Sequence, residues 1–292
     1  MNQTRVSVII CAYTMERLKD IHEAVDSVLA QTLKPHEVIV AVDHNQELLH
    51  SLKSELPPDV KVVLNDSPHG GSSATDNVGV SIATGDIVAF MDDDAVAERD
   101  WIEQLVKPYQ EPSILAVGGK IVPVWQNERP KWFCEELNWI VGSTYKGHPE
   151  DRTEVRNLIF CNASLRRQVF DSLGLFPADT GRSVNWGTGF ESQFFLRMKS
   201  RMPEAVVLYE PSAIVYHKVT SQRAKMKYLI LRCYNEGFHK AKVKRACAGL
   251  SQRPLSTESS YLRYLLLSAI PHRLMHFYKP RALAEAGAIG VS

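Results

Sequence analysis

The sequence is poor in cysteine, and the few that it has are scattered. Five cysteines occur in 292 residues, and none of them forms a pair separated by two positions. An odd, dispersed set argues against a disulfide framework and against a structural zinc site, and is typical of a reducing compartment. The five are Cys11, Cys134, Cys161, Cys233 and Cys247.

Long hydrophobic runs and a charge excess are also lacking. The longest late apolar run, Tyr264 to Ile270, is far shorter than the roughly 20 residues that span a bilayer. The first expected strand begins near Arg5, which leaves no room for a signal peptide. The formal net charge is only +1, so no overall field favours nucleic acid. We therefore expect a cytoplasmic protein that does not bind nucleic acid.

The glycine fingerprints of common nucleotide-binding folds are missing as well. No GxGxxG follows the first expected strand and no P-loop occurs, which disfavours a dinucleotide-dependent dehydrogenase. A glycine-containing stretch, residues 69–79, does precede an expected helix, where backbone N–H groups could approach a ligand. A loop that merely turns the chain is equally consistent with this stretch.

Alternating strand and helix patterns are what the first third of the chain does contain. Continuous apolar runs predict buried strands, and apolar residues at steps of three and four predict the helices between them. This alternation predicts an α/β fold with parallel strands and right-handed crossovers. The expected strands are residues 5–13, 37–43, 60–64 and 87–91, and the first two helices cover 18–29 and 48–56.

Carboxylates follow these strands. Asp43 ends the second, and Asp92, Asp93 and Asp94 follow the fourth. Ligands of open α/β sheets bind at the carboxyl ends of the strands, and carboxylates there suit Mg²⁺ or Mn²⁺ with phosphates completing the shell. The alternative is an acidic cluster ahead of a helix that begins at Trp101, which the helix dipole would favour.

Several segments together carry a family pattern. In order they are residues 6–13, 24–32, 37–40, 71–79, 83–86 and 91–94. Over roughly residues 5–220 the chain resembles family 2 glycosyltransferases of the GT-A type. Residues 13–17, 139–145 and 154–157 most resemble archaeal glucosyl-dolichyl-phosphate glucuronosyltransferases and their bacterial relatives.

The resemblance implies a GT-A fold: a mostly parallel central sheet flanked by helices in residues 1–220, followed by a basic helical extension, 221–292. It also implies a UDP-sugar donor. Asp43 would accept hydrogen bonds from the base, Asp92 would lie near the ribose, and Asp94 would bind a divalent cation that bridges the phosphates, with His217 as a further ligand. The remaining implied donor contacts are Ala12, Tyr13, Asn77 and Asp93, the last of which points elsewhere if strand alternation continues.

Two positions depart from the family pattern. Asp76 stands before Asn77 where the family usually has Arg, and an acid there cannot hold a phosphate. Phe190 precedes Glu191 where the family reads Glu-Asp, the Asp being the general base. Glu191 would then take the proton from the acceptor hydroxyl. The alternative role is that of a helix N-terminal Glu favoured by the dipole.

The segment from Arg223 to Arg245 carries eight basic residues and one acid, Glu236, with aromatic and aliphatic residues between them. It predicts an amphipathic helix on an anionic membrane surface, with a solvated helix face as the alternative. The family resemblance together with this segment implies an inverting, metal-dependent transferase that uses UDP-glucuronate or UDP-glucose and a polyprenyl- or dolichyl-phosphate-linked acceptor at the cytoplasmic face of a membrane. A soluble or polysaccharide acceptor with this segment as a dimer surface, or a non-catalytic nucleotide-sugar-binding protein, stay open as alternatives.

Overall fold

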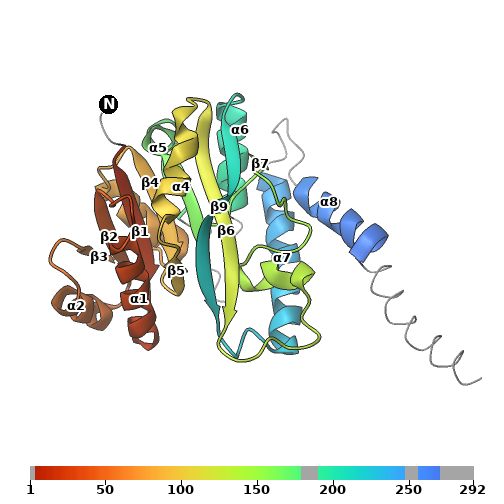
Figure 1. The fold of residues 1–292 in the computed structure, drawn as a ribbon, viewed down its shortest axis with the longest axis horizontal. Coiled ribbons are helices and arrows are strands. Elements are labelled where there is room, and N and C mark those ends of the chain that lie inside the picture. The colour runs from red at the N-terminus through yellow and green to blue at the C-terminus, as the bar shows by residue number, and fades with distance from the viewer. Residues whose placement is uncertain (1–3, 179–189, 247–255, 270–292) are drawn as a thin grey trace, which may run out of the picture.

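The computed structural model describes residues 4–178, 190–246 and 256–269, and among these one mixed sheet of nine strands carries helices on both faces (Figure 1). The strand order is β3-β2-β1-β4-β8-β6-β9-β5, with β7 beside β9. The strands are β1 Val6–Ala12, β2 Glu37–Asp43, β3 Lys61–Asn65, β4 Ile87–Asp92, β5 Ala95–Ala97, β6 Ile114–Trp125, β7 Thr153–Glu154, β8 Asn162–Arg166 and β9 Val206–Val219.

The helices follow the predicted pattern through the first third of the chain. The longer ones are α1 Leu18–Leu29, α2 Gln46–Glu55, α3 Ser72–Ile82, α4 Trp101–Val106, α5 Arg167–Leu173, α6 Phe190–Arg201, α7 Met226–Ala246 and α8 Ser256–Tyr264. Short 3₁₀ turns occur at Met15–Arg17, Lys107–Gln110 and Glu135–Val141, and a π turn at Leu265–Ala269. Within the described residues, no helix combines the length and the apolarity needed to cross a bilayer.

The first four strands are parallel, as predicted, and their registers bring their polar ends to one edge. Cys11 of β1 lies opposite Asp92 of β4, and Asp43 of β2 lies opposite Asn65 of β3. Because all four strands run in the same direction, the residues that follow each strand lie together at this edge.

The other half of the sheet is mixed rather than mostly parallel. Strand β8 runs antiparallel to both β4 and β6, and β5 and β7 run antiparallel to β9. Between β6 and β8 the chain forms a 3₁₀ turn and β7 but no crossover α-helix. Parallel neighbours need such a crossover, so the chain returns antiparallel here.

Residues 206–219 form a single strand, β9, although Pro211 lies within it. Its parallel register with β6 shifts at Gly119 and Lys120, opposite the stretch from Glu210 to Ile214. Proline cannot donate to the ladder, so an irregularity takes up the residues that do not pair. A side chain at Gly119 would place Cβ 1.8 Å from the Ala213 carbonyl oxygen, so the crossing of β6 and β9 requires glycine there.

Two apolar layers enclose the sheet. In β1, Val8 and Ile10 face the layer that contains α1, α2 and α4, while Ile9 faces the layer formed by α3, α5 and α6. The second layer is rich in phenylalanine, with Phe90 of β4 in ring contact with Phe160 and Phe176. Rigid packing on both faces holds the polar strand ends in place.

The chain beyond β9 is helical in the part that the structure describes. The segment 223–245 predicted as one helix is α7, which begins at Met226. A second helix, α8, begins at Ser256, and positions after 269 lie outside the described residues. The division into two domains at residue 220 stays a prediction.

Candidate active site

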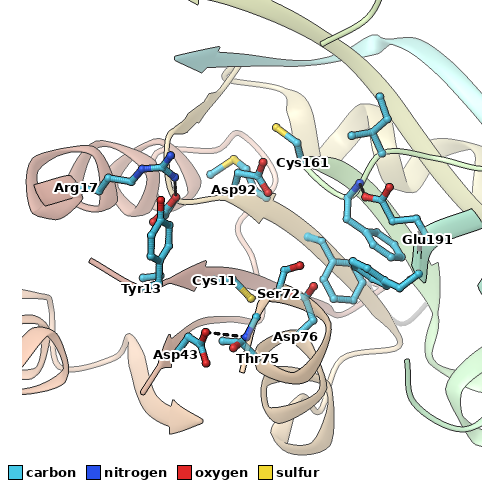
Figure 2. A pocket seen from close by; sticks show the side chains of 18 residues that line it. Cys11, Tyr13, Arg17, Asp43, Ser72, Thr75, Asp76, Asp92, Cys161 and Glu191 are labelled. Carbon is cyan, nitrogen blue, oxygen red and sulfur yellow. Dashed lines mark hydrogen bonds and ion pairs between the residues drawn. The ribbon is translucent and has the colours of Figure 1, made fainter. Parts of the chain in front are cut away.

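A pocket of about 390 Å³ opens at the carboxyl ends of the parallel strands (Figure 2). Its walls come from the end of β1, Asp43 of β2, the start of α3, the end of β4, residues 159–161 before β8, and the first turn of α6. The picture shows Tyr13 and Arg17 at one end and Glu191 at the other, with Asp92 between them. The sequence-predicted residues Ala12, Tyr13, Asp43, Asp92, Asp93 and Glu191 all line it.

The three consecutive aspartates differ sharply in accessibility. Asp92 is the last residue of β4, and its side chain is 48% exposed, whereas the side chains of Asp93 and Asp94 are 3% exposed. The chain turns after Asp92, so the alternation of the strand ends there. Asp92 is therefore the member of the triplet that a ligand in the pocket meets first.

Arg17 holds the two buried acids. It lies in the 3₁₀ turn after β1, with one guanidinium nitrogen 2.5 Å from Asp93 Oδ1 and the other 3.0 Å from Asp94 Oδ2. Burial raises the pKa of Asp93 to about 7 despite Arg17. Burial acts the same way on Asp94, but His217 and Arg17 outweigh it and hold the pKa of that carboxyl below its usual range. Asp94 is thus ionised at neutral pH.

His217 of β9 completes this corner of the site. Its Nε2 lies 3.1 Å from Asp94 Oδ1 and 3.8 Å from Asp92 Oδ2, and its Nδ1 has no hydrogen-bond partner among the described residues. Arg223, just before α7, lies 3.9 Å from Asp94 Oδ2. The imidazole thus lies between two carboxylates, and oxygen and nitrogen donors of this kind suit a hard divalent cation. Arg17 and Arg223 already lie against Asp94, so their positive charges would compete with a cation at that carboxylate.

Cys161, and not Asp94, completes the group of three potential ligands that lie together among the described residues. Ligand atoms of Asp92, Cys161 and His217 lie within 4.8 Å of one another. Burial raises the pKa of the Cys161 thiol well above its usual value, and the negative charges of Asp92 and Asp94 raise it further. A thiol that stays protonated is a poor ligand for Mg²⁺ or Mn²⁺, so the oxygen and nitrogen donors carry the fit.

Glu191 stands in the first turn of α6, at the pocket wall. The backbone N–H of Phe160 donates to Glu191 Oε1 over 3.0 Å, which fixes one side of the carboxylate. Burial raises the pKa of Glu191 to about 7, and the charge of Asp92 acts in the same direction. A carboxylate of that pKa, oriented and facing a pocket, suits proton transfer near neutral pH.

The α3 end of the pocket differs from expectation. Asp76, not Asn77, faces the pocket, and the Cys11 thiol donates to Asp76 Oδ1 over 2.8 Å. Burial raises the pKa of Asp76 to about 7. Asn77 instead exchanges two 2.9 Å hydrogen bonds with the backbone of Phe176, so the structure does not bring this predicted donor contact to the site.

Asp43 is fixed by its surroundings. The Gly71 N–H donates to Oδ2 over 2.7 Å, and Asn65 Nδ2 donates to Oδ1 over 3.1 Å. At the pocket mouth, the Tyr13 ring is 53% exposed and carries the Arg17 guanidinium 5.1 Å from its centroid. A fixed carboxylate beside an open aromatic face is suited to a planar heterocycle.

Arg17 and Arg223 both lie against Asp94, and neither was predicted as a site residue from the sequence. Arg17 follows the first strand by five positions and therefore had to lie at the same sheet edge as the acids. Arg223 was included only in a basic surface stretch. Neither residue stands in a motif that specifies its partner, and only the packing of distant segments pairs them with Asp94.

Comparison with known proteins decides the family. A family model described as "Glycosyl transferase family 2" matches residues 7–174, which include all of β1 except its first residue, β2 to β4 and the triplet of aspartates. The chain belongs to glycosyltransferase family 2. It is therefore an enzyme of glycosyl transfer, and the alternative of a non-catalytic binding protein falls away.

Characterised relatives extend over most of the chain. The chain is 35% identical over 284 residues, 96% of its length and 89% of the relative's, to a protein of Haloferax volcanii named "Glucosyl-dolichyl phosphate glucuronosyltransferase". It is 28% identical over 247 residues, 81% of its length and 74% of the relative's, to the succinoglycan biosynthesis protein ExoM of Rhizobium meliloti. Both similarities continue beyond the segment that the family model covers.

Solved structures share the fold at low sequence identity. GalNAc-T7 with UDP, GalNAc and Mn²⁺ superposes with a TM-score of 0.57 at 16% identity, over 78% of this chain and 47% of that one. Residues 1–349 of S. aureus TarS in complex with UDP superpose with a TM-score of 0.54 at 16% identity, over 90% of this chain and 72% of that one. These likenesses support the GT-A-like α/β architecture of the family 2 enzyme.

Proposed function

We propose that this family 2 enzyme transfers a sugar from a UDP-sugar to a hydroxyl group of a polyprenyl- or dolichyl-phosphate-linked glycan, with inversion at the anomeric carbon. The observation that carries the proposal is that Asp92 and Glu191 line one pocket, which also holds Asp43 and the open ring of Tyr13. A nucleotide end and a proton-accepting end therefore share one cavity. The name of the Haloferax volcanii relative favours UDP-glucuronate as donor and a lipid-linked acceptor.

The predicted residues have distinct roles in this proposal, and two of them, Asp94 and His217, lie beside the pocket rather than in its lining. Tyr13 and Asp43 bind the base, and Asp92 lies at the ribose. Asp94 and His217 would hold Mg²⁺ or Mn²⁺, which when bound supplies positive charge against the departing nucleoside diphosphate.

Glu191 accepts the proton of the attacking hydroxyl. The pocket needs no protein nucleophile for this reaction, because a single base allows direct displacement by the acceptor, and direct displacement inverts the anomeric centre. Retention of configuration in the product would contradict this part of the proposal.

A donor screen tests the proposed reaction. The purified protein is incubated with individual UDP-sugars, a polyprenyl-phosphate-linked glucose and Mn²⁺, Mg²⁺ or chelator, and UDP release and product are measured. We expect cation-dependent transfer from one donor, and loss of both turnover and cation-dependent UDP binding in Asp94→Ala. Asp59→Ala, an exposed acid between α2 and β3, is the matched control. Full activity of Asp94→Ala would rule out the cation role.

The acceptor class is tested in the same assay. Transfer to the lipid-linked glucose but not to a soluble glucoside or polysaccharide supports the proposal, and the reverse preference supports the soluble-acceptor alternative. A lipid-linked acceptor also fits peripheral contact with the cytoplasmic face of a membrane, which we propose as the working location.

A further inference from the structure

Helix α7 carries an apolar strip on its outer face. Met226, Ile230, Tyr234 and Phe238 recur every four residues, and their side chains are between 49% and 74% exposed. Residues four apart are neighbours on a helix surface, so the four form one continuous strip. Contiguous exposed apolar surface of this kind marks an interaction site rather than ordinary surface.

The charges on this helix are of one sign on the exposed side. Its exposed residues that carry a charge at neutral pH are all basic: Lys227, Lys242, Lys244 and Arg245. The single acid of α7, Glu236, is 24% exposed and pairs with Arg232 at 3.6 Å and Lys240 at 3.3 Å. The outer face thus combines apolar rings with lysines at both ends and no carboxylate.

The combination of exposed apolar and basic side chains favours one kind of binding partner for this face. A helix with an apolar strip bordered by basic side chains lies in the interface of an anionic bilayer, where both features are satisfied. A second copy of the same face would bring lysines against lysines, because a two-fold interface pairs each patch with itself. Lys242 already lies over the Phe238 ring at 4.7 Å, so its stem covers apolar surface while its charge stays outside.

The inner face of α7 ties this surface to the active site. Lys240 Nζ lies 3.1 Å from Ser192 Oγ, next to Glu191 in the first turn of α6, and Val243 packs on Leu196 of α6. Lys240 also pairs with Glu258 of α8 at 2.8 Å. The helix that would meet lipid is therefore the one that backs the proposed base.

We propose that the outer face of α7 is a docking surface for an anionic lipid bilayer, which holds the Glu191 end of the pocket beside the membrane. The value of this placement for a lipid-linked acceptor rests on the proposed function, but the docking itself does not. It depends only on the strip of Met226, Ile230, Tyr234 and Phe238 and on the lysines beside it.

Vesicle sedimentation tests the surface directly. The full chain is spun with phosphatidylcholine vesicles with and without phosphatidylglycerol. We expect binding to the anionic vesicles only, released by high salt. The triple variant Ile230→Ser, Tyr234→Ser and Phe238→Ser should bind at least tenfold more weakly. Val124→Ser with Leu175→Ser, two half-exposed apolar residues elsewhere, should bind as the wild type does.

A charge variant keeps the test independent of the apolar substitutions. Lys242→Gln with Lys244→Gln changes only exposed side chains, and each lost charge should weaken anionic-vesicle binding about fivefold. Lys53→Gln, an exposed lysine of α2, is the matched control. Equal binding to neutral and anionic vesicles, or unchanged binding of both variants, overturns the proposal.

Two further outcomes separate competing explanations. Sedimentation velocity that shows a dimer dissociated by the triple substitution, with no vesicle binding, overturns the proposal in favour of a second copy. UDP release with a soluble acceptor analogue should be unchanged in the triple variant, whose residues lie outside the pocket. Absence of transfer with every donor would remove the proposed function while leaving the vesicle result to stand.

Discussion

The pH dependence of turnover is the sharpest test of Glu191. Its carboxylate is oriented by the Phe160 N–H at 3.0 Å, and burial raises its pKa to about 7. A general base works only when ionised. We therefore expect kcat/KM for the donor, which reports the free enzyme, to rise tenfold per pH unit at low pH and to level off above about pH 7. At about pH 6, about one-tenth of the plateau rate should remain.

Substitution then assigns the rise of the rate at low pH, the acid limb of the profile, to one residue. Glu191→Gln should lower kcat by on the order of 10²–10⁴ and remove the limb from the residual rate. UDP binding should be unchanged, because Tyr13 and Asp43 lie at the other end of the pocket. Asp76→Asn is the matched control, because the pKa of Asp76 is also raised to about 7. Its Oδ1, however, accepts a hydrogen bond from the Cys11 thiol, so we do not expect it to act as the base.

The assay is initial-rate UDP release between about pH 5 and pH 9 in buffers of constant ionic strength, with donor below saturation. Two results would refute the reasoning. One is a rate that stays level through this range, and the other is a limb that persists in Glu191→Gln but disappears in Asp76→Asn. Circular dichroism at each pH separates loss of activity from loss of structure.

Other predictions concern stability and charge. Because folding raises the pKa of Asp76, the stabilising effect of its protonated form is complete below about pH 4 and is lost as pH rises through about 7. The free energy of unfolding of Asp76→Asn, measured by urea titration, should therefore rise by about 2–3 kcal/mol relative to the wild type between pH 5 and 8. A difference that does not change with pH would contradict this. Lys240→Met removes a charge that lowers the pKa of Glu191, so the acid limb should move to higher pH, and no movement excludes the electrostatic role. Gly119→Ala should prevent folding, because its Cβ would overlap the backbone of Ala213, and thermal melting should then show no cooperative transition. Gly237→Ala in α7, which has open space around it, should stabilise the protein by about 1 kcal/mol.

The secondary structure of the first third was predictable because it is written in local patterns. The runs that became β1, β2 and β4 are buried on both faces and contain little but apolar residues, so their period needs no tertiary information. Strand β9 was not predictable as one strand, because Pro211 reads as a break and only pairing with β6 carries the strand past it.

The position of the site was also predictable, but its internal charge pairing was not. Parallel strands put Asp43 and Asp92 at one edge whatever the later chain does. Which acid of the triplet faces the pocket depended on the turn after Asp92 and on Arg17, whose partners are distant in sequence. Asn77 was expected at the donor and instead binds the backbone of Phe176, because the short segment after α5 that contains Phe176 packs on α3.

The sequence by itself determined the α/β start of the fold, the edge at which the acids gather and the family to which the chain belongs. These follow from alternation, strand ends and short motifs, which depend on neighbours along the chain. Only the tertiary structure decided that Asp92 is open while Asp94 is buried against Arg17 and His217, and that α7 turns Lys240 inward and Tyr234 outward. Burial and ion pairing arise from contacts between segments far apart in the chain, and local sequence does not encode which segments meet.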